Sequence, residues 1–321
     1  MNTALSDFDD WILRDPDAGQ HMQARISDIL DDAGLSYDRV TVRVKDRESF
    51  AAKLANDNYP TYVDFCSAYD LLGIRVITLH SSEIPQLKQA LSEAFEIVSV
   101  IDKAAENARA GKFGYASQHL IVRDKEPHSG PELLEIQLRT VLQHAWAEFE
   151  HDIRYKNRQQ VDPQVHRAFT LAAGLIELAD QQFDMIAEHM EAQAAERSTA
   201  GATIDAKTLP RQLSAIIGEK FPTSRLEYYS YAVSMLAAHG ITTYGELADL
   251  LSPDHQEKLE EAMGYTYRPG QVRFIDDMLL FIYGREHIKK TVHIGSNTGS
   301  RPGRLGSRWQ RLGQRSLAET L

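Results

Sequence analysis

The spacing of hydrophobic and polar residues divides the chain into segments of different period. Residues 1–40 mix polar and apolar positions at helical spacing and stop at Gly34. Residues 41–156 combine strand-like segments with helical stretches around 49–54 and 83–95. Strands are expected at 41–45, 73–79, 118–123 and 133–140. Strands interleaved with helices predict an α+β domain built on a mixed sheet.

The second half of the chain reads as helical. Between Val165 and Met190 apolar residues recur at steps of four and three for about 25 residues. The simpler interpretation is that this stripe covers the core of its own domain, and the alternative is the seam of a homo-oligomer. Thr243 to Glu246 forms a capping-box sequence inside a further helical region at 206–290.

These patterns predict three parts. The first is a domain at 1–200 with its core at 41–156, and the second is an all-α accessory domain at 206–290. The third is a tail at 295–321, for which we predict disorder because residues 295–316 contain five glycines, five arginines and no acid.

Composition narrows the function. The chain has 43% hydrophobic and 25% charged residues, as soluble globular proteins do, and no apolar run reaches the roughly 18 residues of a membrane span. We therefore expect a cytoplasmic protein with no membrane contact. Cys66 is the only cysteine, which excludes an intramolecular disulfide. The net charge of −11 disfavours nonspecific nucleic-acid binding but leaves a local basic surface open.

Candidate chemistry lies on the strand faces. The strand expected at 133–140 alternates, so its apolar residues enter the core and its polar residues share the opposite face. The first expected strand alternates in the same way. The polar residues involved are Arg43, Lys45, Glu135, Gln137 and Arg139. Carboxylates can hold Mg²⁺ while Arg and Lys neutralise phosphate oxygens, although the alternation alone favours a solvated face with salt bridges.

Two further motifs change that balance. Asp70 to Arg75 (DLLGIR) places an acid just before a buried strand, and Gly114 to His119 (GYASQH) leads into the third strand. With Arg43 to Lys53 before them and Glu135 to Lys156 after them, the set resembles the synthetase domain of the RelA/SpoT family in composition, order and spacing. The resemblance covers about residues 41–156.

The resemblance implies a nucleotidyltransferase-like mixed sheet flanked by helices. It also implies transfer of the β,γ-pyrophosphate of ATP to the 3′-hydroxyl of GDP or GTP, which makes (p)ppGpp and AMP. By position, Asp70 and Glu135 would hold Mg²⁺, and Glu135 is the candidate base for the attacking hydroxyl. Arg43, Lys45, Ser49, Lys53 and Arg75 would bind ATP. Tyr115, His119, Gln137 and Arg139 would bind the acceptor.

The acceptor side departs from the family pattern. Of the expected basic segment and lead-in, residues 100–115 keep in recognisable form only Lys112, the Gly-Tyr pair at 114–115, and either Asp102 or Lys103. The alternative is therefore a toxin-type relative that pyrophosphorylates the 3′ end of tRNA or adenosine nucleotides. The arginines of the tail would then supply a basic surface for RNA. An idle nucleotide-binding regulator is a third hypothesis, and the C-terminal helical region suggests regulation rather than chemistry.

Overall fold

The computed structural model describes residues 3–56, 62–102, 117–126, 130–156, 163–195, 201–314 and 316–317. It divides into two compact units. Unit 1 comprises Met1–Ile29 and Tyr37–Met185, and unit 2 comprises Leu30–Ser36 and Ile186–Leu321. The helices α2 (Ala18–Asp32) and α7 (Pro163–Ala195) each contribute residues to both units. None of the helices in the described part of the chain combines the length and hydrophobicity that a membrane span requires.

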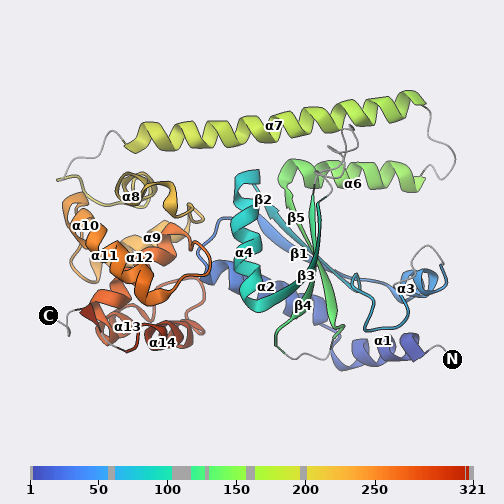
Figure 1. Cartoon of the computed structure of the whole chain (residues 1–321), viewed down its shortest axis with the longest axis horizontal. Helices are drawn as coiled ribbons and strands as arrows, with labels where there is room; N and C mark the ends of the chain where they lie inside the picture. The colour runs from blue at the N-terminus through green and yellow to red at the C-terminus, as the bar shows by residue number, and fades with distance from the viewer. Residues whose placement is uncertain are drawn as a thin grey trace. The chain divides into compact units, whose positions relative to one another are not determined.

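Unit 1 is built on one five-stranded mixed sheet in the order β1-β2-β5-β4-β3 (Figure 1). The central pair, β2 and β5, is parallel, and the other neighbouring strands are antiparallel. The strands are β1 (Arg39–Val44), β2 (Leu72–Thr78), β3 (Phe95–Asp102), β4 (Gln118–Asp124) and β5 (Leu133–Thr140). The remaining helices are α1 (Thr3–Arg14), α3 (Arg47–Leu54), the 3₁₀ turn η1 (Ser81–Glu83), α4 (Ile84–Ala94) and α6 (Val141–Lys156).

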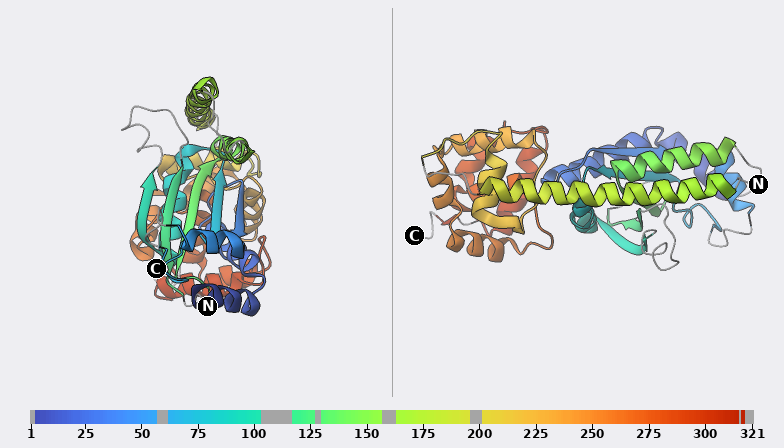
Figure 2. Two further views of the ribbon diagram at one scale, coloured as in Figure 1. Left: turned by 90° about the vertical axis from the view of Figure 1, so that its right-hand side faces the viewer. Right: turned by 90° about the horizontal axis from the view of Figure 1, so that it is seen from above.

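The core of unit 1 lies on one face of this sheet. Apolar residues of the three central strands, such as Ile74, Leu120 and Ile136, are completely buried there. Leu87 of α4 and Ile26 of α2 are completely buried as well. Figure 2 shows the five strands side by side. Because strand side chains alternate, the buried apolar face leaves the polar residues of β2, β4 and β5 together on the opposite face.

The predicted strands are confirmed, and the sequence interpretation missed one. The strand β3 begins at Phe95, directly after α4 ends at Ala94. The sequence pattern instead predicts that the helix continues to Phe95. As the edge strand it leaves Val98 and Val100 about half exposed, so its pattern lacks the clean alternation of a half-buried strand.

The first part of α7 packs on α6 through aromatic residues. The rings of Trp146 and Phe169 meet edge to face at 5.2 Å, and Thr140 Oγ1 donates to Asp180 Oδ2 at 2.9 Å. The apolar stripe predicted to cover the core is only partly buried, since Val165 is exposed. A second stripe on α7, formed by Leu171, Leu175 and Leu178, is more than half exposed.

Unit 2 is helical, and α12 (Gln271–Tyr283) is buried along most of its length. Phe274 of α12 stacks on Phe221 with ring centroids 3.9 Å apart, and the predicted capping box at Thr243 is present. The other helices are α8 (Leu209–Ile217), the 3₁₀ turn η2 (Gly218–Lys220), α9 (Tyr228–Ala237), α10 (Tyr244–Leu250), α11 (Pro253–Met263), α13 (Arg285–Thr291) and α14 (Arg301–Arg311).

The segment 30–36 packs against the start of α12. The Gly270 backbone N–H donates to Ala33 O at 2.8 Å, and a Cβ at position 270 would lie 1.8 Å from Gly34 O. Gly34 itself has a φ of 69°, which ends α2 as the sequence predicted. Both glycines are therefore required by the close approach of two backbones.

The prediction of a disordered tail at 295–321 is wrong for the described residues. The helix α14 lies in this segment, and its Leu305 and Trp309 are buried in the core of unit 2. Arg301 and Arg308 are buried too, because both pair with Asp276 of α12. The local composition did not indicate this helix, because the aspartate that pairs with its arginines lies in α12. The predicted domain boundaries also differ, since unit 2 begins within α7 and includes 30–36.

Candidate active site

The polar face of the sheet holds five of the eleven predicted site residues in two rows. The strand register aligns Arg43 with Gly73 and Gly73 with Glu135. The next row aligns Arg75 with Gln137. It continues to His119, which is paired with Gln137 across β4 and β5. The side chains of each row point to the same side of the sheet because all lie on one parity of the pleat.

A carboxylate with two lysines forms the first cluster. Asp70, just before β2, accepts hydrogen bonds through Oδ2 from Lys45 Nζ at 2.8 Å and from Lys53 Nζ of α3 at 2.5 Å. All three side chains are at least three-quarters buried. Burial alone would raise the pKa of Asp70, but the bonds from Lys45, Lys53 and Tyr62 outweigh it and hold that pKa below its ordinary value. Asp70 is therefore ionised at neutral pH.

A chain of hydrogen bonds leads from the second carboxylate. Glu135 Oε1 lies 2.9 Å from His119 Nδ1, and His119 Nε2 lies 2.7 Å from Ser117 Oγ. Gln137 Nε2 donates to Glu135 Oε2 at 2.8 Å, and Arg139 donates to Gln137. Burial would raise the pKa of Glu135, but His119 and Gln137 hold it below its ordinary value, while the charge of Asp70 acts in the opposite direction. That electrostatic coupling links the two clusters.

The remaining predicted residues lie around these clusters. Arg75 Nη1 pairs with Glu148 Oε1 of α6 at 2.9 Å. Arg43 is exposed, and its Nη2 lies 3.8 Å from Asp46 Oδ2. Ser49 lies in the first turn of α3, where its backbone N–H donates to the Asp46 side chain. These residues are not joined to the Asp70 cluster by any contact that the described side chains record.

One predicted residue cannot be placed, and one near the site was missed. Tyr115 lies outside the described residues. Tyr62 was not foreseen, although its ring lies 4.6 Å from Lys53 Nζ and its hydroxyl bonds with Asp70. It follows a segment rich in Asn and Pro that has no periodic pattern, so no sequence signal pointed to it.

The carboxylates offer a place for a divalent cation. Asp70 Oδ1 is buried and has no hydrogen-bond partner among the described residues, so one oxygen of an ionised carboxylate is left to a ligand. No group of three or more metal-binding side chains occurs in the part of the chain that the structure describes. Two carboxylates completed by substrate phosphates is the usual arrangement for Mg²⁺, so Asp70 and Glu135 fit that ion.

A cavity of about 270 Å³ in unit 1 lies between α4, α6 and α7 and reaches Ser117, the partner of His119. Three acids, Asp102, Glu177 and Asp180, line it, and no Lys or Arg is found among its described lining residues. Such a lining repels phosphate. The basic residues of the sheet face, rather than this cavity, are therefore the place where a nucleotide phosphate chain can be neutralised.

Several known proteins are similar to this chain. The family described as "Region found in RelA / SpoT proteins" matches residues 42–160. The GTP pyrophosphokinase YjbM of Bacillus subtilis (strain 168) is 30% identical over 162 residues, covering 49% of this chain and 75% of YjbM. Small alarmone synthetase 1 of Bacillus subtilis aligns with a TM-score of 0.49 and 24% identity, over 57% of this chain and 97% of that chain. A GTP pyrophosphokinase family protein from Streptococcus pneumoniae aligns with a TM-score of 0.49 and 20% identity, over 57% and 94%.

The chain is therefore a pyrophosphokinase, the class of enzyme to which its relative YjbM belongs. The match to three quarters of YjbM at 30% identity establishes common descent. The chain belongs to the RelA/SpoT family.

The glycine between Arg43 and Glu135 yields a prediction. A Cβ at Gly73 would meet only Arg43 O, at 3.8 Å, so a larger side chain fits the backbone but projects onto the polar face. We expect Gly73→Val to keep or raise the melting temperature and to lower turnover by about 100-fold, because it displaces substrate from the carboxylates. Gly73→Ala is the matched control and should lose much less. Wild-type turnover in the valine variant would mean that substrate does not lie over this row.

Proposed function

We propose that this enzyme transfers the β,γ-pyrophosphate of ATP to the 3′-hydroxyl of GDP or GTP, producing (p)ppGpp and AMP. The observation that carries the proposal is that Glu135 lies on the polar face of the sheet, while Lys45 and Lys53 converge on Asp70 just before β2. The name of the relative YjbM, a GTP pyrophosphokinase, supports the guanosine acceptor. The proposed substrates also fit the expected cytoplasmic location.

The donor half of the site would bind ATP through its basic residues. Lys45 and Lys53 already converge on one carboxylate oxygen, and on binding they would turn toward the triphosphate, joined by Arg75. Arg43 is exposed beside them, and its planar guanidinium suits stacking on adenine. Ser49 would add a hydroxyl from the first turn of α3. Because phosphoryl transfer relies on positioning and charge neutralisation, this set supplies what the donor needs.

The acceptor half would activate the hydroxyl. Glu135, ionised because of its hydrogen bonds, would take the proton of the 3′-hydroxyl as the oxygen attacks the β-phosphorus. A new O–P bond forms there, the bond from the β-phosphorus to the oxygen shared with the α-phosphorus breaks, and AMP leaves with that oxygen. His119, fixed between Glu135 and Ser117, would keep the carboxylate oriented.

The other acceptor residues and the metal complete the proposal. Gln137 and Arg139 would contact acceptor phosphate or ribose, and Tyr115 would stack on the acceptor base. When bound by Asp70 and Glu135, Mg²⁺ would neutralise charge on the triphosphate. Of the tail arginines expected to form a basic surface for tRNA, Arg301 and Arg308 are buried in ion pairs, so fewer exposed cations are left for a tRNA acceptor than the sequence suggests.

The proposal is tested by a transfer assay with ATP labelled at the γ-phosphate and Mg²⁺. Separate reactions contain GDP, GTP, ATP alone or deacylated tRNA. We expect label in a guanosine nucleotide together with AMP, and a loss of about 10²- to 10⁴-fold in Glu135→Gln, because the amide cannot accept the proton. Label on tRNA or on adenosine nucleotides instead would contradict the guanosine acceptor and support the toxin-type reaction. No transfer to any acceptor would identify an idle nucleotide-binding regulator.

We also propose that the enzyme self-associates through α7. Leu171, Leu175 and Leu178 follow the four- and three-residue steps of a helix seam, and each is more than half exposed. Light scattering should give a mass above that of one chain, and Leu175→Asp should reduce it. A monomeric mass for the wild-type protein at micromolar concentration would contradict this proposal.

A further inference from the structure

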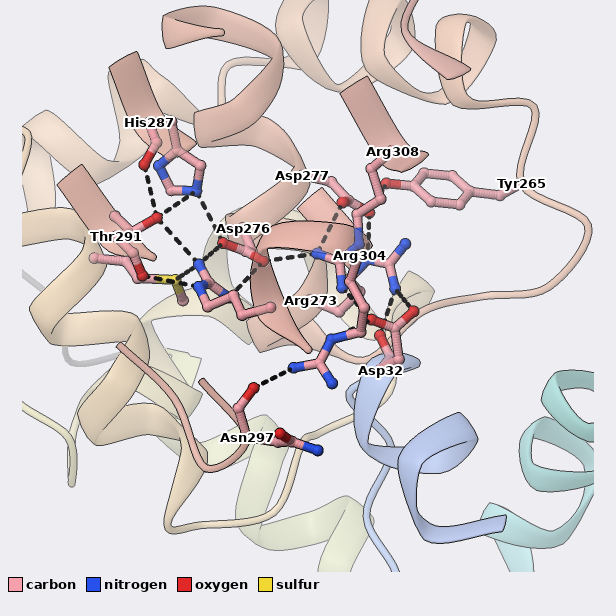
Figure 3. A network of polar contacts seen from close by, with 12 residues as sticks. Asp32, Tyr265, Arg273, Asp276, Asp277, His287, Thr291, Asn297, Arg304 and Arg308 are labelled. Atoms are coloured by element: carbon pink, nitrogen blue, oxygen red, sulfur yellow. Dashed lines mark hydrogen bonds and ion pairs between the residues drawn. The ribbon is translucent and has the colours of Figure 1, made fainter. Parts of the chain in front are cut away.

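Three arginines of unit 2 converge on one carboxylate. Asp32 Oδ1 lies 2.5 Å from Arg308 Nη2 and 3.2 Å from Arg304 Nε, and Asp32 Oδ2 lies 2.8 Å from Arg273 Nη1 (Figure 3). Burial would raise the pKa of Asp32, but the three guanidinium groups outweigh it and hold that pKa far below its ordinary value. Asp32 is therefore a permanent anion within this arginine cradle, formed by Arg273, Arg304 and Arg308.

The cradle is held in place without Asp32. Arg273 Nε donates to Asp277 at 2.8 Å, and Arg308 Nη1 donates to Asp276 at 2.7 Å. Arg304 is fixed by Ser300 Oγ at 2.7 Å and by the Asn297 carbonyl at 3.2 Å. Each guanidinium thus has an anchor independent of Asp32, which is the preorganisation that an anion site requires.

The net positive charge of this network favours an anion that carries more negative charge than a single carboxylate. The ion-pair network combines Arg273, Arg301, Arg304 and Arg308 with Asp32, Asp276 and Asp277, so four positive and three negative groups leave +1. If Asp32 withdrew, the two inner aspartates would leave +2. Two of the three carboxylates lie deep in the network, whereas the Asp32 side chain is 30% exposed. Asp32 is therefore the one that a solvent anion can replace.

A small cavity adjoins the cradle. It has a volume of about 70 Å³. Its lining includes four arginines, the three of the cradle and Arg301, against three aspartates, Asp31, Asp32 and Asp276, together with Tyr228, Tyr231 and the loop Gly295–Asn297. One water needs at least about 10 to 15 Å³ of such space, so the cavity holds roughly five oxygen positions. That is the size of one tetrahedral phosphate group. Guanidinium groups bind phosphate through paired N–H donors, which matches the lining.

We propose that the arginine cradle is a binding site for the phosphate group of a small ligand, and that Asp32 occupies this site until the ligand replaces it. Asp32 is the last residue of α2, and Gly34 follows it with its positive φ. Displacement of Asp32 would free the end of a helix whose earlier residues belong to unit 1. The site would thereby give the C-terminal unit a ligand-sensing role, independent of which acceptor the enzyme uses.

The test measures phosphate binding to the full chain by calorimetry, with Asp32→Asn as the main variant. We expect the variant to bind orthophosphate at least tenfold more tightly than wild type, because it removes the competing carboxylate. Its melting temperature should fall in chloride buffer and recover in phosphate. The matched control is Asp254→Asn, an exposed carboxylate of α11 that pairs with Lys258 at 2.8 Å and is not among the described residues that line the cavity, so its phosphate affinity should equal that of wild type.

A second variant keeps the test decisive if Asp32→Asn does not fold. Arg304→Gln removes the most exposed guanidinium of the cradle and should weaken phosphate binding at least tenfold. Titration with glycerol phosphate beside orthophosphate distinguishes a phosphorylated metabolite from free phosphate as the tighter ligand. Unchanged phosphate affinity in both Asp32→Asn and Arg304→Gln would overturn the proposal and leave the network with a purely structural role.

Discussion

The parallel pairing of β2 with β5 is the constraint on which the site depends. It sets Gly73 beside Glu135 and Arg75 beside Gln137, and the alternation of both strands sends their apolar residues to the opposite face. A register shift of one residue would bury Glu135 and expose Ile136. The same strand register therefore buries the hydrophobic core on one face and aligns the polar side chains on the other. The packing of the core thus determines the positions of the site residues.

On that face, the two carboxylates stay ionised although they are largely buried. Asp70 is compensated by two lysines, and Glu135 by His119 and Gln137. Buried charges persist only when they are paired in this way. Negative and positive side chains can therefore lie together in this site when no nucleotide is bound. In the proposed reaction the same lysines would turn to phosphate, and Asp70 Oδ1, which has no partner among the described residues, would bind the cation. Unit 2 repeats this logic with the signs reversed, because its arginines are compensated by an internal aspartate.

Much of unit 1 could be predicted from the sequence. Four of its five strands were expected from short-range periodicity, and the face shared by Glu135, Gln137 and Arg139 followed from alternation alone. The hydrogen bond from Lys53 to Asp70 could not be derived from periodicity, because it joins α3 to the loop before β2. Tyr62 was missed for the same reason. The edge strand β3 escaped because an exposed edge relaxes the alternation that identifies strands.

In unit 2 the prediction of a disordered tail failed, because the arginines of α14 are neutralised by aspartates distant in the chain. Asp276 precedes Arg308 by 32 residues, and Asp32 precedes it by 276. Local composition reports a basic, glycine-rich segment and carries no information about such partners. The spacing of Leu305, Trp309 and Leu312 was the available signal of a packed helix, but it is short and interrupted by glycines.

The central claim is that Asp70 stands at the reaction centre. The most direct measurement is the rate of AMP release from ATP with GDP and Mg²⁺ in Asp70→Asn, compared with Asp64→Asn, an exposed carboxylate in a nearby turn with Ser67. We expect Asp70→Asn to lose activity by about 100-fold or more while remaining folded, because Asp70 offers a ligand oxygen to the cation and orders the two lysines. Asp64→Asn should keep its activity, because Asp64 lies in an exposed turn with Ser67. Wild-type AMP release in a folded Asp70→Asn variant would contradict the account.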